Sequence, residues 1–182
     1  MKVIFLDIDG VLNTPSSESR CGEYIGIDDD KVERLKKIVD KTKAEIVLIS
    51  TWKKYWRKEE KSKPLQDYSA NYLDEKLAKQ GLKAIDKTKD KSDGRYLSRG
   101  ESILEYVYRN NVKKYIILDD CQFDYDGYGI ADKLVKTSQI EGLTEKEVKN
   151  TCEILANNSI ITTSEIPNEG VFDYGKQRQN KV

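Results

Sequence analysis

Two aspartates at the end of the first apolar run carry the clearest chemical signal in this sequence. Asp7 and Asp9 follow residues 2–6, which are rich in β-branched and aromatic side chains and predict a buried strand. Gly10 then allows the chain to turn away. Carboxylates this close repel one another unless a cation separates them, and Mg²⁺ is suited because it prefers oxygen ligands. The pattern therefore predicts a metal site at the end of this strand.

Two further apolar segments end in side chains that suit a phosphate or its metal. Residues 45–49 and 115–118 read as buried strands. The polar residues that follow them are Ser50, Thr51, Asp119 and Asp120. Right-handed crossovers place the carboxyl ends of parallel strands along one edge of a sheet, where ligands bind. We therefore expect these residues to meet Asp7 and Asp9 at a common edge.

The rest of the chain alternates strands with helices, which predicts a doubly wound parallel sheet in a three-layer α/β/α sandwich. Further strands are expected at residues 82–85 and 133–137. Helices are expected at residues 28–43, 52–61 and 68–80, from Ser98 to Asn110, and from Thr144 onward. Residues 86–96 read as a polar loop. We expect residues 1–157 to form one core domain and leave the order of the tail, residues 158–182, open.

Composition excludes several classes of protein. The 182 residues are 37% hydrophobic and 35% charged with a formal net charge of zero, which gives no global attraction to nucleic acid. The absence of histidine removes serine-histidine triads and histidine-ligated zinc, so acid-base chemistry falls to other side chains. Three scattered cysteines and the lack of a membrane-length apolar run favour a cytoplasmic protein that does not contact a membrane.

The segment from Asp7 to Val11 resembles the first motif of the haloacid dehalogenase-like superfamily, Asp-x-Asp-Gly-[Thr/Val] after an apolar strand. The resemblance implies a Rossmann-like fold and phosphatase activity through an aspartyl-phosphate. Asp7 would be the nucleophile and Asp9 the general acid and base. Alone, this pattern also fits a capped turn with solvated carboxylates.

Three further motifs of that superfamily follow in the right order. Ser50 matches the second motif and would donate to a phosphate oxygen, although Thr51 is a neighbouring candidate and a serine here also suits a helix N-cap. Arg99 matches the cationic third motif and would neutralise phosphate charge, although an arginine here could also face solvent. Asp119 and Asp120 match the acidic fourth motif, which could otherwise be a surface turn.

The resemblance also implies how Mg²⁺ would be held. Its ligands would be the Asp7 carboxylate, the main-chain carbonyl of Asp9, and a carboxylate from Asp119 or Asp120. Asp124, in the loop that follows, could support these ligands from outside the first coordination sphere.

The substrate is less constrained than the reaction. The gaps between motifs leave no room for a large cap domain, so the site is expected to be open and to admit the end of a polymer. Residues 51–58 interleave aromatic and cationic side chains, which suits stacking on bases and contact with backbone phosphates. The spacing of Trp52, Tyr55 and Trp56 equally fits the buried face of a helix. Candidate substrate-binding residues are Gly10, Thr51, Trp52 and Lys53.

The motifs are also similar to those of the capless phosphatase domains of polynucleotide kinase-phosphatases and RNA-repair proteins. This likeness implies that the substrate is a terminal phosphate of a nucleic acid or a nucleotide. A phosphatase for a small metabolite or phosphoprotein, and a module that binds phosphate or Mg²⁺ without turnover, are the alternatives. Oligomeric state is left open.

Overall fold

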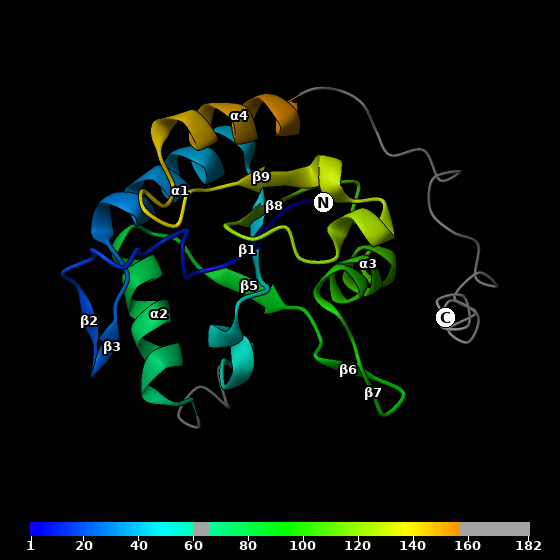
Figure 1. Ribbon diagram of the computed structural model, residues 1–182, viewed down its shortest axis with the longest axis horizontal. Helices are drawn as coiled ribbons and strands as arrows, with labels where there is room; N and C mark the ends of the chain where they lie inside the picture. The colour runs from blue at the N-terminus through cyan, green and yellow to red at the C-terminus, as the bar shows by residue number, and fades with distance from the viewer. Residues whose placement is uncertain (60–65, 157–182) are drawn as a thin grey trace, which may run out of the picture.

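A five-stranded parallel sheet forms the centre of the molecule (Figure 1). The structure is a computed structural model and describes residues 1–59 and 66–156. The strands are β1 Lys2–Leu6, β4 Glu45–Leu48, β5 Ala84–Lys87, β8 Lys114–Asp119 and β9 Leu134–Lys136. They lie in the order β5-β4-β1-β8-β9, and every neighbouring pair is parallel. The predicted parallel α/β sheet is confirmed.

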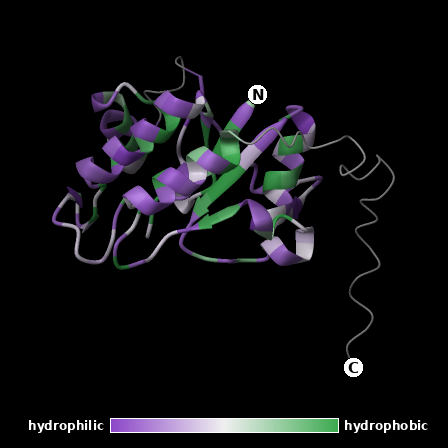
Figure 2. Ribbon diagram, turned by 90° about the horizontal axis from the view of Figure 1, so that it is seen from above, coloured by the Kyte–Doolittle hydropathy of each residue, from purple (hydrophilic) through white to green (hydrophobic). Residues whose placement is uncertain are grey.

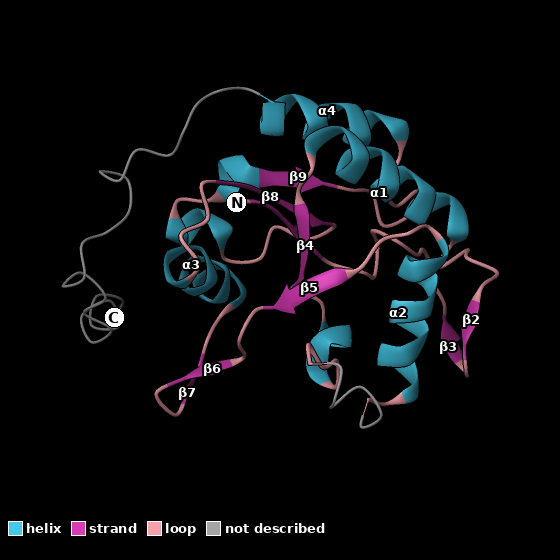
Figure 3. Ribbon diagram, turned by 180° about the vertical axis from the view of Figure 1, so that it is seen from behind, coloured by secondary structure: helices cyan, strands magenta, loops and turns pink. Residues whose placement is uncertain are grey.

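Helices cover both faces of the sheet and complete three layers (Figure 3). One face packs against α1 (Asp29–Thr42), α2 (Tyr68–Lys79) and α4 (Glu145–Ala156), and the other packs against α3 (Arg99–Arg109). These four helices match the predicted ones to within two residues at the ends that the sequence specified.

Strand β1 separates the two cores. Ile4 and Leu6 point into the layer under α1, α2 and α4, whereas Val3 and Phe5 point into the layer over α3. All four side chains are fully buried, which explains why the strand reads as a continuous apolar run rather than an alternating one. Figure 2 shows the hydrophobic strands in the middle of the molecule, between helices with many hydrophilic residues.

Residues 52–61 do not form the predicted helix over the part that the structure describes. The segment after β4 makes one short 3₁₀ helix, η1 (Thr51–Lys54), and the chain then continues without helical structure to residue 59. Lys87 donates to the main-chain oxygens of Lys53 and Trp56 at 2.7 and 2.8 Å, which takes acceptors that a longer helix would use. The Trp56 side chain is instead buried and donates to Asp74 at 2.8 Å.

Residues 86–96 are more ordered than the predicted loop. Strand β5 lies two residues later than expected, and a hairpin of β6 (Lys91–Ser92) and β7 (Arg95–Tyr96) follows it. Asp93 and Gly94 form the turn, and both have positive φ angles, of 51° and 78°. Asp-Gly between two strands is a strong hairpin signal that the high charge of this segment obscured.

No large cap covers the sheet edge in the described part of the chain. Between β1 and α1 the chain makes only a small hairpin of β2 (Arg20–Cys21) and β3 (Tyr24–Ile25). The described residues also contain no helix long and apolar enough to cross a bilayer. The expected tail falls outside these residues.

The second core depends on an aromatic cluster around Phe5. Its ring meets the rings of Tyr106 and Tyr115 edge-on, with centroids 5.6 and 5.5 Å away. We expect Phe5→Ala to lower the free energy of unfolding by about 3–5 kcal/mol, since it removes a fully buried aromatic ring. Urea unfolding measures this change. Ile140→Ala, at a side chain that is 80% exposed, is the control and should change it by less than about 0.5 kcal/mol.

Candidate active site

The site begins where three neighbouring strands end together. Leu6 of β1 is in register with Leu48 of β4 and with Leu118 of β8. The amide of Asp7 extends this pairing and donates to the Leu118 carbonyl at 2.9 Å. Asp7 therefore leaves the sheet beside Asp119, as the strand-end argument predicted.

Arg99 joins the two carboxylates. Its Nη1 donates to Asp7 Oδ1 at 3.0 Å and to Asp119 Oδ2 at 2.9 Å, so one nitrogen lies between two buried acids. The ring of Phe123 lies 4.1 Å from Arg99 Cζ, at a distance typical of a cation-π contact. The predicted solvent-facing alternative for Arg99 is therefore wrong, and Phe123 is a contact that the sequence did not indicate.

Asp124 fixes the start of the helix that carries Arg99. Its Oδ1 accepts from the Gly100 amide at 2.9 Å, which satisfies a free donor of the first turn of α3. Gly100 is needed there because a Cβ would lie 2.7 Å from the Tyr128 ring. Ser98, as predicted, is the N-cap and accepts from the Glu101 amide, although the Glu101 carboxylate binds Arg95 instead of completing the capping box.

The Asp119 side chain is fully buried and hydrogen-bonded on both oxygens. Oδ1 accepts from the Cys121 amide at 2.9 Å, and Oδ2 accepts from the Tyr125 hydroxyl at 2.8 Å as well as from Arg99. Burial raises the pKa of Asp119, and these donors oppose the rise. Tyr125, also fully buried, was not singled out from the sequence because its loop reads only as rich in tyrosine and glycine.

Gly10 makes room for Asp120. The φ angle of Gly10 is +73°, and a Cβ there would lie 2.6 Å from Asp120 Cγ. A cavity of about 430 Å³ opens here, and Asp7, Asp9, Gly10, Thr51, Arg99 and Asp120 are among the residues that line it. Gly10, which the sequence indicated only as a turn residue, thus also allows Asp120 of the fourth motif to lie close to the first motif.

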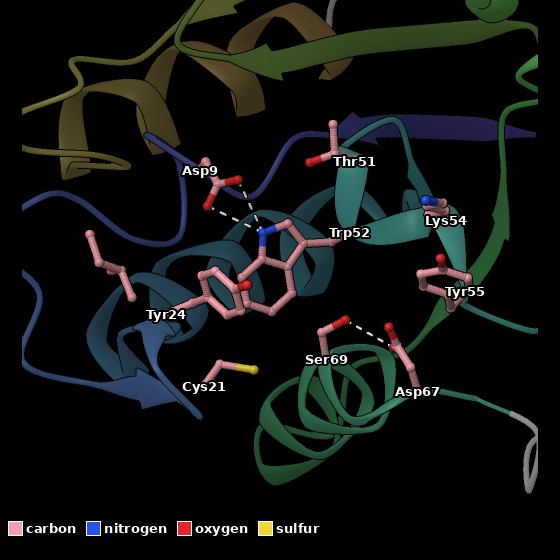
Figure 4. Close-up of a pocket in the computed structure, with 10 residues that line it drawn as sticks. Asp9, Cys21, Tyr24, Thr51, Trp52, Lys54, Tyr55, Asp67 and Ser69 are labelled. Carbon is pink, nitrogen blue, oxygen red and sulfur yellow. Dashed lines mark hydrogen bonds between the residues drawn. The ribbon is translucent and has the colours of Figure 1, made fainter.

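Asp9 is held at the mouth of the cavity by two donors. Trp52 Nε1 lies 3.1 and 3.2 Å from its carboxylate oxygens, and Asn13 Nδ2 donates to Oδ1 at 2.9 Å (Figure 4 shows the Trp52 contact). Asn13 Oδ1 in turn accepts from the Gly10 amide at 3.1 Å. Asn13 thus closes a tight turn between Asp9 and Gly10 and its own side chain, and nothing in the sequence had indicated Asn13 as a site residue.

Ser50 and Thr51 have different surroundings. Ser50 is 1% exposed, its hydroxyl interacts with Asp7, and its Oγ accepts from the Trp52 amide at 3.4 Å as the N-cap of η1. Thr51 is exposed and lines the cavity. The two candidates therefore both lie at the site, Ser50 buried in contact with Asp7 and Thr51 exposed in the cavity lining.

Lys53 is not brought to the cavity. Its ammonium group is buried and binds the Thr88 hydroxyl at 2.7 Å, the Thr88 carbonyl at 3.1 Å and Asp90 at 2.9 Å. The short 3₁₀ geometry of η1 turns Lys53 toward the end of β5, whereas Lys54 and Tyr55 face a neighbouring cavity (Figure 4). The assignment of Lys53 to substrate binding is therefore corrected.

The Asp7 carboxyl has the electrostatics of a poorly solvated acid. Burial raises its pKa from 3.8 to about 6, Arg99 opposes this rise, and the charge of Asp119 adds to it. The negative charge of Asp7 is thus not fully compensated by the protein alone, which favours a further cation.

The oxygen donors of this cavity suit a hard divalent cation. Among the described residues, Asp119, Asp120 and Cys121 have potential ligand atoms within 4.8 Å of one another. The Asp119 oxygens are already engaged, and a thiol is a soft ligand that Mg²⁺ does not prefer. The carboxylates of Asp7 and Asp120, which line the same cavity, are the better candidates.

Removing the charge of Asp7 should stabilise the metal-free protein. The folded pKa near 6 exceeds the ordinary value of 3.8, so ionised Asp7 destabilises the fold above about pH 6, and this penalty disappears as the pH falls toward 4. We expect Asp7→Asn to raise the free energy of unfolding by about 1–3 kcal/mol near pH 7.5 and by almost nothing near pH 4. Urea unfolding in the presence of a chelator at several pH values measures this. Equal stability of the two proteins near pH 7.5 would contradict it.

The space at Gly10 can be tested against another glycine. Gly81 has a similar φ of +68°, but no atom lies within 4 Å of a Cβ built there. Both alanine variants pay the cost of positive φ, about 1 kcal/mol, and only Gly10→Ala also displaces Asp120, for about 1–3 kcal/mol more. The difference in urea midpoint between the two variants measures the displacement. Equal midpoints would show that Asp120 moves aside freely.

A comparison with known families agrees with this geometry. Residues 3–148 match a model of the family described as the HAD (haloacid dehalogenase-like) domain in Swiss Army Knife RNA repair proteins. Comparisons with curated proteins and with solved structures find no match. The family match spans all four motifs, from Asp7 to Asp120, and covers more than half of the chain. The chain therefore belongs to the HAD domains of Swiss Army Knife RNA repair proteins.

Proposed function

We propose that this protein is a Mg²⁺-dependent phosphatase that removes a terminal phosphate from a nucleic acid or nucleotide through an aspartyl-phosphate on Asp7. The observation that supports it most is the contact of Arg99 with both Asp7 and Asp119, in the cavity that Asp9 and Asp120 also line. The proposed nucleophile and acid, which share one segment, thus meet a cation from a segment far along the sequence.

The first step would be attack by an Asp7 carboxylate oxygen on phosphorus. The new oxygen–phosphorus bond forms as the bond to the leaving oxygen breaks, and Asp9 donates a proton to that oxygen. Arg99 already touches Asp7 Oδ1, so its charge lies where the phosphoryl oxygens would approach. Hydroxyls of Ser50 and Thr51 are the candidate donors to those oxygens.

The second step would hydrolyse the aspartyl-phosphate. Asp9, now ionised, takes a proton from a water molecule, whose oxygen attacks phosphorus and displaces Asp7 as a free carboxylate. Trp52 and Asn13 hold the Asp9 carboxylate through hydrogen bonds, which keeps it at the mouth of the cavity for both proton transfers. Inorganic phosphate leaves, and both aspartates return to their starting protonation states.

The Asp7 and Asp120 carboxylates would hold the Mg²⁺, with the main-chain carbonyl of Asp9 as a further ligand. When bound, the ion supplies positive charge that reduces repulsion between Asp7 and the phosphate. Asp119 would act differently from the sequence-based assignment. Since it accepts from Arg99, Tyr125 and the Cys121 amide, it would orient Arg99 rather than bind the ion directly.

Three observations support a nucleic-acid end as the substrate. The family is named for RNA repair proteins, and the described residues contain no large cap that would restrict entry to a small metabolite. The exposed rings of Tyr55, which follows η1, and of Tyr24 in the β2–β3 hairpin lie beside the cavity.

Hydrolysis assays test this function. We expect Mg²⁺-dependent release of phosphate from phosphorylated oligonucleotides, and loss of kcat by roughly 10³-fold or more in Asp7→Asn because no nucleophile remains. Asp126→Asn is the matched control, since Asp126 is exposed and its carboxylate accepts from the Gln122 side chain at 3.0 Å. The kcat of Asp126→Asn should equal that of the wild type.

The substrates to be assayed are 5′- and 3′-phosphorylated RNA and DNA, mononucleotides, sugar phosphates and phosphopeptides. Activity confined to sugar phosphates or phosphopeptides would overturn the nucleic-acid assignment. Unchanged turnover in Asp7→Asn would overturn the mechanism, and full activity with a chelator would overturn the metal dependence.

A further inference from the structure

A second cavity, of about 450 Å³, adjoins the one that contains Asp7 (Figure 4). Asp9, Ile25 and Thr51 line both cavities, so the two are neighbours, and together they are called the cleft. The second cavity lies between the β2–β3 hairpin, η1 and the start of α2. Its volume falls within the range of about 300–1,000 Å³ that small-molecule sites occupy.

Aromatic side chains from two separate elements line this second cavity. Trp52 and Tyr55 come from η1 and its end, and Tyr24 comes from the hairpin. Tyr24 and Tyr55 are 77% and 47% exposed, so both rings are accessible to a ligand. Exposed rings from two elements around one hollow favour a flat apolar ligand.

The Trp52 indole is fixed before any ligand arrives. Its edge is held by the hydrogen bonds to Asp9, and its ring packs against Tyr72 with centroids 6.3 Å apart. Because Nε1 is already engaged, the indole offers a stacking surface but no free donor to read a ligand. A ligand here would gain from stacking and from little base-specific hydrogen bonding.

Among the described residues, one ammonium group and two carboxylates line the second cavity, so it has no excess of positive charge and suits a neutral ring better than a second anion. Lys54 contributes a cation, and its Nζ lies 4.9 Å from the centre of the Tyr55 ring. Both carboxylates are held by hydrogen bonds: Asp67 Oδ1 accepts from the Ala70 amide and from Ser69 as the N-cap of α2, and Asp9 accepts from Trp52.

We propose that this second cavity binds the base of the nucleotide whose phosphate lies at Asp7, by stacking and without choosing among the four bases. This inference rests on the proposed function, and it identifies the base as the part of the substrate that the second cavity recognises. The aromatic walls begin beyond Asp9 and Thr51, so the flat group must be separated from the phosphate by a spacer. A ribose provides that spacer, whereas the ring of phosphotyrosine is bonded directly to its phosphate.

The test compares a phosphorylated RNA oligonucleotide with the same strand whose terminal nucleotide keeps its ribose but lacks the base. Stacking predicts that the wild type has a kcat/KM about 5- to 150-fold higher on the strand with the base. The four bases should differ from one another by much less than this ratio. In Tyr24→Ala the ratio should fall toward one.

The matched control is Tyr96→Ala. Tyr96 is 71% exposed on the β6–β7 hairpin and is not among the residues that line either cavity, so this variant should keep the wild-type ratio.

Trp52→Phe separates the stacking role of Trp52 from its hydrogen bonds to Asp9. It keeps a ring for stacking but loses the donor to Asp9, so it should lower kcat on both strands and keep most of the ratio.

Binding to Asp7→Asn provides a readout that needs no turnover. Fluorescence anisotropy should give a Kd for the strand with the base that is lower by the same ratio, and Tyr24→Ala in this background should remove the difference. Equal Kd values for the two strands, or tighter binding of a phosphotyrosine peptide, would overturn the base site while leaving phosphatase activity intact. A clear preference for the base with no hydrolysis by the wild type would overturn the proposed function instead.

Discussion

One guanidinium group between two buried carboxylates is the interaction on which the site depends. Parallel pairing of β1 with β8 forces Asp7 and Asp119 to leave the sheet as neighbours, and Arg99 compensates part of their repulsion. The buried Tyr125 hydroxyl and the Cys121 amide hold Asp119, and Asp124 anchors the first turn of α3. The position of Arg99 is therefore set from both sides, by the strand end and by the helix start, and this arrangement tolerates a charged nucleophile in a poorly solvated place.

The part of this arrangement that depends on regular structure could be read from the sequence. Apolar runs that end in Asp7, Ser50 and Asp119 identify parallel strands, and strand topology alone then brings them to one edge. Arg99 could be located because a helix cap pattern fixes where α3 begins. These predictions succeed because buried parallel strands have few ways to pair, and because a cap specifies one residue.

The remainder depends on contacts between segments that no local pattern encodes. Lys53 reads as a surface cation beside the second motif, yet the contacts with Thr88 and Asp90 turn it away from the cavity. Tyr125 and Asn13 occupy loops whose composition is ordinary, and only the folded chain shows what they hold. The shortened helix after β4 has the same origin, since Lys87 from β5 takes its carbonyl groups.

The side chains of Lys53 and Lys87 both connect η1 with the end of β5, in opposite directions. Lys53 extends from η1 to the end of β5, and Lys87 extends from β5 back to η1. These hydrogen bonds join η1 to the end of β5 in both directions, so they restrain the wall of the cleft that Thr51 and Trp52 form. The opposite wall is a hairpin that contacts α2 but whose strands have only two residues each, so few hydrogen bonds of its own hold it. Adaptation to ligands of different size would therefore fall to Tyr24 and its hairpin, while the reacting groups keep their alignment.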